Sequence, residues 1–182
     1  ICSRVLRRDG GAIGISPNFV IYDDDDQIRL IKQALNEIGL DEKQYAPRSI
    51  QARISSAKSA LLDPEDYSSQ GVSSYFDEIA ARVYRRYQQL LEINQAVDFD
   101  DLLMKVVLLW KSYPDILQQY RDRWKYVLVD EYQDTNRAQY MLINLLTQEH
   151  RNIFVVGDED QGIYSWRAAD IRNILNFERD YP

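Results

Sequence analysis

Apolar residues recur at three- and four-residue spacing through much of the chain, which is the period of an amphipathic helix. The segment from Val72 to Asn94 shows this spacing over the longest distance, with Ile79, Val83, Tyr87 and Leu90 on one face. The same pattern and its flanking residues predict further helices at residues 28–38, 49–62, 102–110 and 114–120. The sequence therefore predicts that residues 22–120 are mostly helical.

Acidic runs stand before two of these predicted helices. Asp23–Asp26 precede the first helix, where carboxylates complement the helix dipole, and a cap is a better interpretation of this run than a cation site. Asp98 is similarly placed to cap the helix that follows it, and capping is favoured over catalysis for Asp98–Asp101. On the long helix, Arg82, Arg85 and Arg86 are candidates for duplex DNA contacts, although a solvated polar face is the favoured interpretation.

The pattern changes to that of buried strands near the end of the chain. Val127–Val129 is a short apolar run that ends in Asp130 and Glu131, and Ile153–Val156 is a second apolar run. The helix-length segment Arg137–Glu149 between them has the length of a crossover between parallel strands. The fold class is therefore α/β, with the two strands side by side. Two carboxylates at the carboxyl end of a buried strand are typical of sites that hold Mg²⁺ and activate water for nucleotide hydrolysis.

Three motif strings in this order resemble those of the superfamily 1 DNA helicases of the UvrD, Rep and PcrA type. They are Asp98–Leu103, Asp130–Asn136 (motif II) and Gly157–Arg167 (motif III). The resemblance implies part of a RecA-like P-loop NTPase domain with a parallel sheet, into which a mostly α-helical subdomain is inserted. It implies the division 1–21 for a first part of the motor domain, 22–96 for the accessory subdomain and 97–182 for the continuation of the motor domain.

The resemblance also implies roles for individual residues in ATP hydrolysis. Asp130 would hold Mg²⁺, and Glu131 would act as general base on the attacking water. Gln161 would sense the γ-phosphate of the bound ATP. Tyr164 and Trp166 would stack on bases of single-stranded DNA with Arg167 beside them, and aromatic stacking contributes about 1–3 kcal/mol per base.

Two positions depart from the family pattern. Gly162 stands where serine is usual, and Ala168 stands where glycine is common after the arginine. The methyl group of Ala168 restricts the backbone, so this loop is expected to be stiffer. Neither departure removes a group with catalytic chemistry.

A phosphate-binding loop needs Gly-Lys followed by Ser or Thr, and the sequence contains no Gly-Lys dipeptide. The chain also begins at Ile1, without methionine, and ends at Pro182 after a helical segment. Together with these features, the resemblance to the helicase family implies an internal fragment whose partners are the P-loop segment and second RecA-like domain of the same chain. The 182 residues alone are expected neither to hydrolyse ATP nor to unwind DNA.

Composition narrows the class of protein further. A hydrophobic content of 45% is ordinary for a globular protein, Cys2 is the single cysteine, and no signal peptide or long apolar run is present, so a cytoplasmic protein without membrane contact is expected. The formal charge of −7 argues against bulk electrostatic binding of DNA. DNA binding would then depend on a local patch and on stacking.

The sequence leaves three functions open. The first is a 3′–5′ helicase or translocase, in repair or replication, that acts on single-stranded DNA and on junctions with duplex. The second is a non-catalytic DNA- or protein-binding module derived from a helicase. The third, a close relative of the first, is the helicase subunit of a recombination nuclease. The compact accessory segment fits the UvrD-like group better than this subunit.

Overall fold

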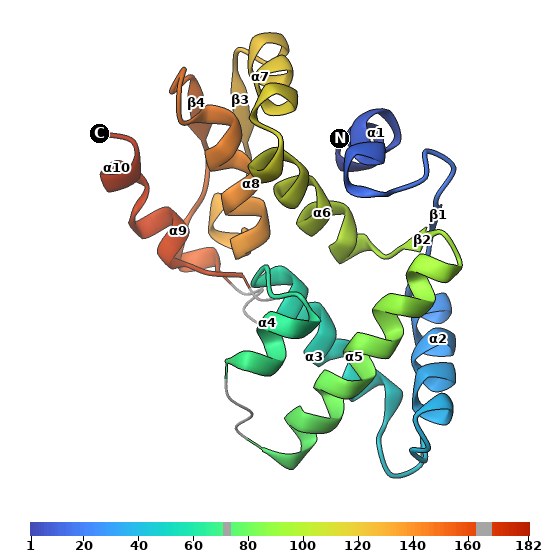
Figure 1. Ribbon diagram of the computed structural model, residues 1–182. Helices are drawn as coiled ribbons and strands as arrows, with labels where there is room; N and C mark the ends of the chain where they lie inside the picture. The colour runs from blue at the N-terminus through green and yellow to red at the C-terminus, as the bar shows by residue number, and fades with distance from the viewer. Residues whose placement is uncertain (71–73, 163–168) are drawn as a thin grey trace. The chain divides into compact units, whose positions relative to one another are not determined.

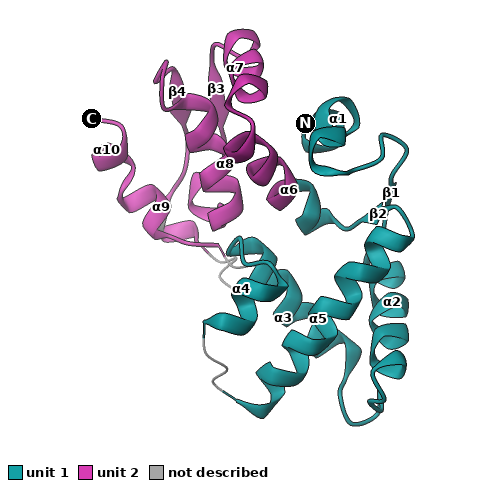
Figure 2. Cartoon of the chain, in the orientation of Figure 1, with its two compact units in different colours: residues 1–102 teal, residues 103–182 magenta. Residues whose placement is uncertain are grey.

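A computed structural model describes residues 1–70, 74–162 and 169–182 of the chain. The fold is a mostly helical α/β arrangement with two small parallel sheets (Figure 1). The chain divides into two compact units, residues 1–102 and 103–182 (Figure 2). This boundary falls inside one helix, and the three-part division expected from the resemblance stays a prediction. No helix in the described ranges is both long enough and apolar enough to cross a membrane.

The first unit is built mainly from helices. The longest, α5, packs against α2, α3 and α4, and their apolar faces form one core (Figure 1). The helices and strands of this unit are α1 (Cys2–Asp9), a 3₁₀ turn (Gly10–Ile13), β1 (Val20–Ile21), α2 (Asp24–Glu37), α3 (Pro47–Ser59), α4 (Pro64–Ser69), α5 (Tyr75–Ile93), β2 (Ala96–Val97) and the start of α6 (Phe99–Ser112). The helices predicted at residues 28–38, 49–62 and 72–94 are confirmed with shifted ends.

Capping residues explain where these helices begin. The carboxylate of Asp23 accepts a hydrogen bond from the Asp26 backbone N–H at 2.9 Å, and the Asp26 carboxylate accepts one from the Asp23 N–H at 3.3 Å. This reciprocal pair confirms the cap that was favoured for the aspartate run. At the start of α4, the Asp63 carboxylate accepts a hydrogen bond from the Asp66 N–H at 2.7 Å. The helix predicted at residues 49–62 stops before this segment, and α4 itself was not predicted.

A short parallel sheet joins the two ends of the segment 22–96. Val20 pairs with Ala96 and Ile21 pairs with Val97. The backbone N–H of Tyr22 also donates to the carbonyl of Val97 at 2.9 Å. The two ends of the segment 22–96 therefore lie next to each other, at the pair of strands β1 and β2.

A buried ionic cluster fastens α3 and α5 to the first turn of α6. Lys58 Nζ lies 2.6 Å from Asp98 Oδ2 and 2.9 Å from Asp101 Oδ1, and the Lys58 side chain is 0% exposed. The hydroxyl of Tyr87 donates to the same Asp98 oxygen at 2.9 Å. The Asp101 N–H donates to Asp98 Oδ1 at 2.8 Å, which confirms Asp98 as a cap. Burial alone would lower the pKa of Lys58, but Asp101 and Asp98 outweigh it and raise that pKa.

Asp100, beside this cluster, gives the first unit a pH dependence. The pKa of Asp100 is raised from 3.8 to about 6, mainly because the side chain is buried. The negative charges of Asp98 and Asp101 also raise this pKa. A hydrogen bond from Ser55 and the positive charge of Lys58 lower it, but by less. A raised carboxyl pKa means that the folded state loses stability as pH rises from about 4 to about 6.

We therefore expect Asp100→Asn to stabilise the chain at pH 7.5, by up to about 3 kcal/mol, and to leave its stability unchanged at pH 4. Urea unfolding of the variant and of the original chain at both pH values measures this difference. An equal gain at both pH values would show that the carboxyl charge has no part in it.

The second unit contains the predicted pair of parallel strands. β3 (Val127–Val129) pairs in parallel with β4 (Ile153–Val155), and the helix α8 (Arg137–Thr147) connects them (Figure 1). The predicted neighbouring strands and crossover helix are therefore confirmed. The other elements of this unit are the rest of α6, α7 (Pro114–Arg123), 3₁₀ turns at Tyr132–Asp134 and Glu159–Gln161, α9 (Arg172–Leu175) and α10 (Phe177–Asp180).

Side chains of α7 hold the end of the crossover helix. Arg121 donates to the carbonyl of Leu145 from Nε at 3.0 Å and from Nη2 at 2.7 Å. Its Nη1 also pairs with the carboxylate of Glu149. A cation at the last turn of a helix satisfies carbonyls that have no partner within the helix. α7 begins at Pro114 as the sequence predicted.

The expectation that β3 and β4 are buried strands is wrong for one face of the sheet. Leu128 is 76% exposed and its register partner Phe154 is 62% exposed. Val127, Val129 and their partners, on the other face, are partly buried. Apolar composition predicted burial on both faces, but no described segment covers the face of Leu128 and Phe154.

Candidate functional site

The two predicted carboxylates lie directly after β3, at the carboxyl end of the strand. Asp130 and Glu131 are both exposed, and the Glu131 backbone N–H donates to Asp130 Oδ1 at 3.0 Å. Glu131 adopts the left-handed conformation with φ 51° and ψ 45°. A residue with a β-carbon is uncommon in this region, and such backbone strain is concentrated at functional sites.

Backbone pairing continues beyond the strands and brings the segment after β3 beside the segment after β4. The Val156 N–H donates to the carbonyl of Val129 at 2.8 Å, and the Tyr132 N–H donates to the carbonyl of Val156 at 3.0 Å. Residues 131–133 therefore lie against residues 156–158. This places the described parts of the two motif strings at one edge of the sheet, as the sequence predicted.

Gln133 joins these two segments through its side chain. The side-chain amide donates to Glu131 Oε2 from Nε2 at 2.7 Å, and its Oε1 accepts the Asp158 backbone N–H at 3.0 Å. Gln133 is only 1% exposed. Gln133 lies within motif II, but no role was predicted for it, because its partner Asp158 is distant in sequence.

Gly157 leaves the space that this amide occupies. A β-carbon at residue 157 would lie 2.5 Å from Gln133 Oε1, 2.8 Å from Ile174 Cδ1 and 3.2 Å from the Tyr132 backbone nitrogen. All three distances are too short for ordinary contact. A side chain at residue 157 would therefore have to displace the Gln133 amide or the end of the Ile174 side chain.

We expect Gly157→Ala to destabilise the second unit by about 1–3 kcal/mol, because the added methyl group must displace the Gln133 amide or Ile174. Thermal unfolding of the variant measures this loss. Gly11→Ala is the matched control, since a β-carbon there meets nothing within 4 Å. Equal unfolding temperatures for the two variants would contradict the close approach at Gly157.

Gln161 ends the short 3₁₀ turn that follows β4. Its Nε2 donates to Asp158 Oδ2 at 2.7 Å, and Asp158 Oδ1 accepts the Asp160 N–H at 3.0 Å. Gln161 is exposed. Three hydrogen bonds thus link Glu131 to Gln161 through the side chain of Gln133 and through Asp158.

Tyr164, Trp166 and Arg167, the predicted DNA-binding residues, lie outside the described residues. The segment that follows them is bonded to motif II. Asn173 Nδ2 donates to the carbonyl of Thr135 at 2.9 Å and to its hydroxyl at 3.1 Å, and the Asp170 N–H donates to the same carbonyl at 3.0 Å. Sequence reasoning did not identify this connection, because Thr135 and Asn173 are distant in sequence.

Asp130 has the chemistry expected of a magnesium ligand. Mg²⁺ is usually held by one or two carboxylates together with substrate phosphates and water, so a single exposed carboxylate at a strand end fits this ion. Within the part of the chain that the structure describes, no group of three or more His, Cys, Asp or Glu is placed to hold a metal by protein ligands alone.

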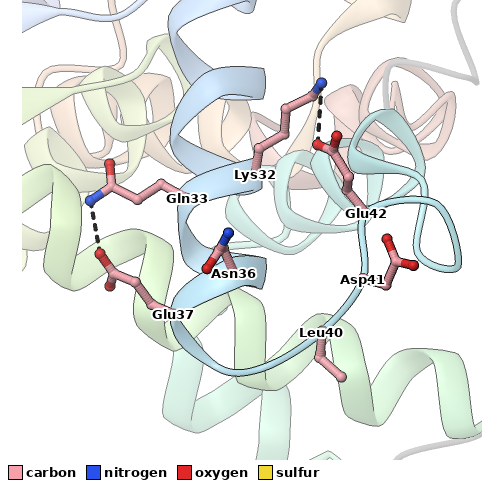
Figure 3. A pocket seen from close by; sticks show the side chains of 7 residues that line it. All are labelled: Lys32, Gln33, Asn36, Glu37, Leu40, Asp41 and Glu42. Atoms are coloured by element: carbon pink, nitrogen blue, oxygen red, sulfur yellow. Dashed lines mark hydrogen bonds and ion pairs between the residues drawn. The ribbon is translucent and has the colours of Figure 1, made fainter.

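Other polar features of the first unit do not contain the predicted site residues. A pocket of about 520 Å³ lies at the end of α2. Lys32 Nζ lies 3.2 Å from Glu42 Oε2 on its wall, and Figure 3 shows this pair among the lining side chains. On α5, Arg85 pairs with Glu65 at 3.2 Å and Arg86 with Glu37 at 2.6 Å. These ion pairs support the polar-face interpretation of the α5 arginines.

Comparison with known proteins gives matches over the whole chain. The family described as "UvrD/REP helicase N-terminal domain" matches residues 1–182. A protein named "ATP-dependent DNA helicase PcrA" from Leuconostoc citreum is 51% identical over 179 residues, which are 98% of this chain and 24% of that protein. Proteins of the same name from Bacillus subtilis (strain 168) and Staphylococcus aureus (strain Mu50 / ATCC 700699) are 50% and 46% identical over 182 residues, covering 100% of this chain and 24% and 25% of those proteins. The chain thus spans about a quarter of the length of these relatives.

Proposed function

We propose, because this chain belongs to the UvrD/REP helicase N-terminal domain family, that it forms part of the ATP-hydrolysing motor of a DNA helicase. The observation that carries the proposal is the match over all 182 residues to proteins named as ATP-dependent DNA helicases. The side-by-side placement of the segments after β3 and β4 supports it, because ATP hydrolysis by this mechanism needs the carboxylates and Gln161 at one edge of the sheet.

In this proposal the residues after β3 act on the nucleotide. Asp130 would hold Mg²⁺, and the bound ion would supply positive charge that stabilises the phosphate groups during hydrolysis. Glu131 accepts a proton from the attacking water, and general-base catalysis of this kind contributes about 10²–10⁴-fold to a rate. The exposed position of both carboxylates leaves them accessible to a nucleotide.

Gln161 is proposed to contact the γ-phosphate, and Tyr164, Trp166 and Arg167 to contact single-stranded DNA. The proposed ATP and DNA contacts, Gln161 and residues 164–167, lie within a few positions of each other in the sequence, between β4 and Asp170, whose N–H donates to the Thr135 carbonyl at 3.0 Å. Such a segment offers a physical route by which the state of the γ-phosphate affects the DNA contacts. We propose 3′–5′ movement on single-stranded DNA as the result.

The architecture proposed around this site is a RecA-like motor domain with residues 22–96 inserted as an accessory subdomain. The parallel pairing of β1 with β2 at the two ends of that segment supports an insertion. These 182 residues contain no Gly-Lys dipeptide. The lysine that binds the phosphates would therefore come from another segment of the motor.

Single-stranded DNA should raise the rate of ATP hydrolysis by the full chain that the gene encodes. The experiment measures the ATPase rate with and without an oligothymidine, and with the 182 residues alone as a second sample. We expect stimulation by the oligonucleotide in the full chain and no hydrolysis by the 182 residues alone. DNA binding without any ATP hydrolysis by the full chain would favour the non-catalytic binding module.

A further inference from the structure

Gln133 is the buried polar side chain at the sheet edge to which the proposed mechanism gives no role. The residue is 1% exposed, yet it lies two positions after the proposed general base. Burying an amide is unfavourable unless its donor and acceptor both find partners. Gln133 meets this condition with one partner on each of the two motif segments, the Glu131 carboxylate and the Asp158 N–H.

The chemistry of the two partners requires an amide between them. The Glu131 carboxylate can only accept a hydrogen bond when ionised, and the Asp158 backbone N–H can only donate one. A glutamine side chain offers a donor and an acceptor on one rigid planar group. An apolar side chain of the same length would leave the Asp158 N–H without this partner and the Glu131 carboxylate without its contact.

The surrounding backbone is shaped around this amide. Gly157 has no β-carbon where Gln133 Oε1 lies, at only 2.5 Å from the position such a carbon would take. The Tyr132 N–H is bonded to the Val156 carbonyl, so the backbone on either side of the amide is held by the sheet. The hydrogen bonds to Glu131 and Asp158 hold the amide between these two stretches of backbone.

We propose that Gln133 is a positioning residue for ATP hydrolysis: it orients the Glu131 carboxylate and links it to the turn that carries Gln161. This inference rests on the proposed function. Glu131 sits on a left-handed backbone and is exposed, so its side chain needs a contact to hold one orientation. The bond from Gln133 at 2.7 Å supplies that contact. Because Asp158 bonds to both Gln133 and Gln161, a movement of this turn changes the position of the base.

The test replaces Gln133 by methionine in the full chain that the gene encodes. Misplacement of a catalytic group by about 1 Å can lower a rate about 100-fold, so we expect kcat to fall about 10- to 100-fold. The KM for ATP and the affinity for a fluorescent ADP analogue should change less than about 2-fold, because Gln133 bonds to Glu131 and is only 1% exposed. Gln139→Met is the matched control, since Gln139 is a glutamine of the same unit that accepts the Asn136 N–H at the start of α8, at 2.9 Å.

A double-mutant cycle separates positioning from a purely structural role. If Gln133 acts through Glu131, adding Gln133→Met to Glu131→Gln should lower the residual rate by less than about 2-fold. A further loss as large as in the single variant would overturn the proposal, and so would an unchanged kcat for Gln133→Met. If the methionine variant does not fold, Gln133→Glu gives the second test, because it keeps the acceptor for Asp158 but replaces the N–H that Glu131 receives.

Failure of the inference can be distinguished from failure of the proposed function. An active full chain that loses hydrolysis on Glu131→Gln but keeps wild-type kcat on Gln133→Met contradicts only the role of Gln133. A full chain without ATP hydrolysis, or one unaffected by Glu131→Gln, contradicts the proposed function itself.

Discussion

Glu131→Gln is expected to lower DNA-stimulated ATP hydrolysis by the full chain about 10³-fold. The amide keeps the size of the side chain but cannot accept a proton from water, and a general base contributes about 10²–10⁴-fold to a rate. Steady-state hydrolysis at saturating ATP and DNA measures the loss. Binding of a fluorescent ADP analogue should be retained, because the substitution removes a catalytic group and not a binding contact.

Glu178→Gln is the matched control for this prediction. Glu178 is an exposed residue of α10 in the same unit, and the same loss of charge there should leave the rate unchanged. A rate within about 10-fold of the original for Glu131→Gln would be too small a change for a general base. Such a result would mean that another residue is the general base.

Lys58→Met is expected to destabilise the first unit by about 3–5 kcal/mol, the cost of breaking a buried ion pair from one side. Asp98 and Asp101, whose side chains are each 2% exposed, would lose the cation that compensates their charge. These contacts join α3 to the start of α6, so the substitution should lower the free energy of unfolding of the whole helical core and not only of one helix. Urea unfolding of the chain measures the change in free energy.

Two further variants test the reason for this loss. Lys43→Met makes the same substitution at an exposed position and should change the stability by less than about 0.5 kcal/mol. Adding Asp98→Asn and Asp101→Asn to Lys58→Met removes the uncompensated charges and should restore much of the lost stability. A loss below about 1 kcal/mol for Lys58→Met alone would contradict the buried cluster.

The local features of the fold could be predicted from the sequence, because their causes are local. Asp23 and Pro114 mark the starts of α2 and α7, and the apolar spacing marks the buried face of α5. The parallel pairing of β3 with β4 followed from a crossover segment of suitable length. Motif II and the segment after β4 were expected at one edge, and backbone hydrogen bonds bring them there.

The contacts that the sequence did not predict involve residues far apart in the chain. Lys58 and Asp98 are separated by 40 positions, and a lysine on a helix is normally exposed, so nothing local indicated a buried pair. Gln133 and Asp158 are separated by 25 positions. The sequence also did not predict that Leu128 and Phe154 are exposed, because apolar strands of a parallel sheet are usually covered on both faces.

The charge of the chain bears on how DNA is bound. A formal charge of −7 gives little attraction for phosphates, and Arg85 and Arg86 are engaged in ion pairs within the first unit. The proposed DNA contacts therefore depend on stacking by Tyr164 and Trp166 and on regions present in the longer relatives. Stacking on aromatic residues is tolerant of base sequence, so we expect binding with little sequence preference.

The measurement that tests the central claim most directly is ATP-driven strand separation by the full chain. The substrates are two short DNA duplexes of the same sequence, one with a 3′ single-stranded tail and one with a 5′ tail. We predict unwinding of the 3′-tailed duplex that requires ATP and is abolished by Glu131→Gln. Failure to unwind either duplex, with ATP hydrolysis indifferent to DNA, would contradict the assignment of this chain to a DNA-translocating motor.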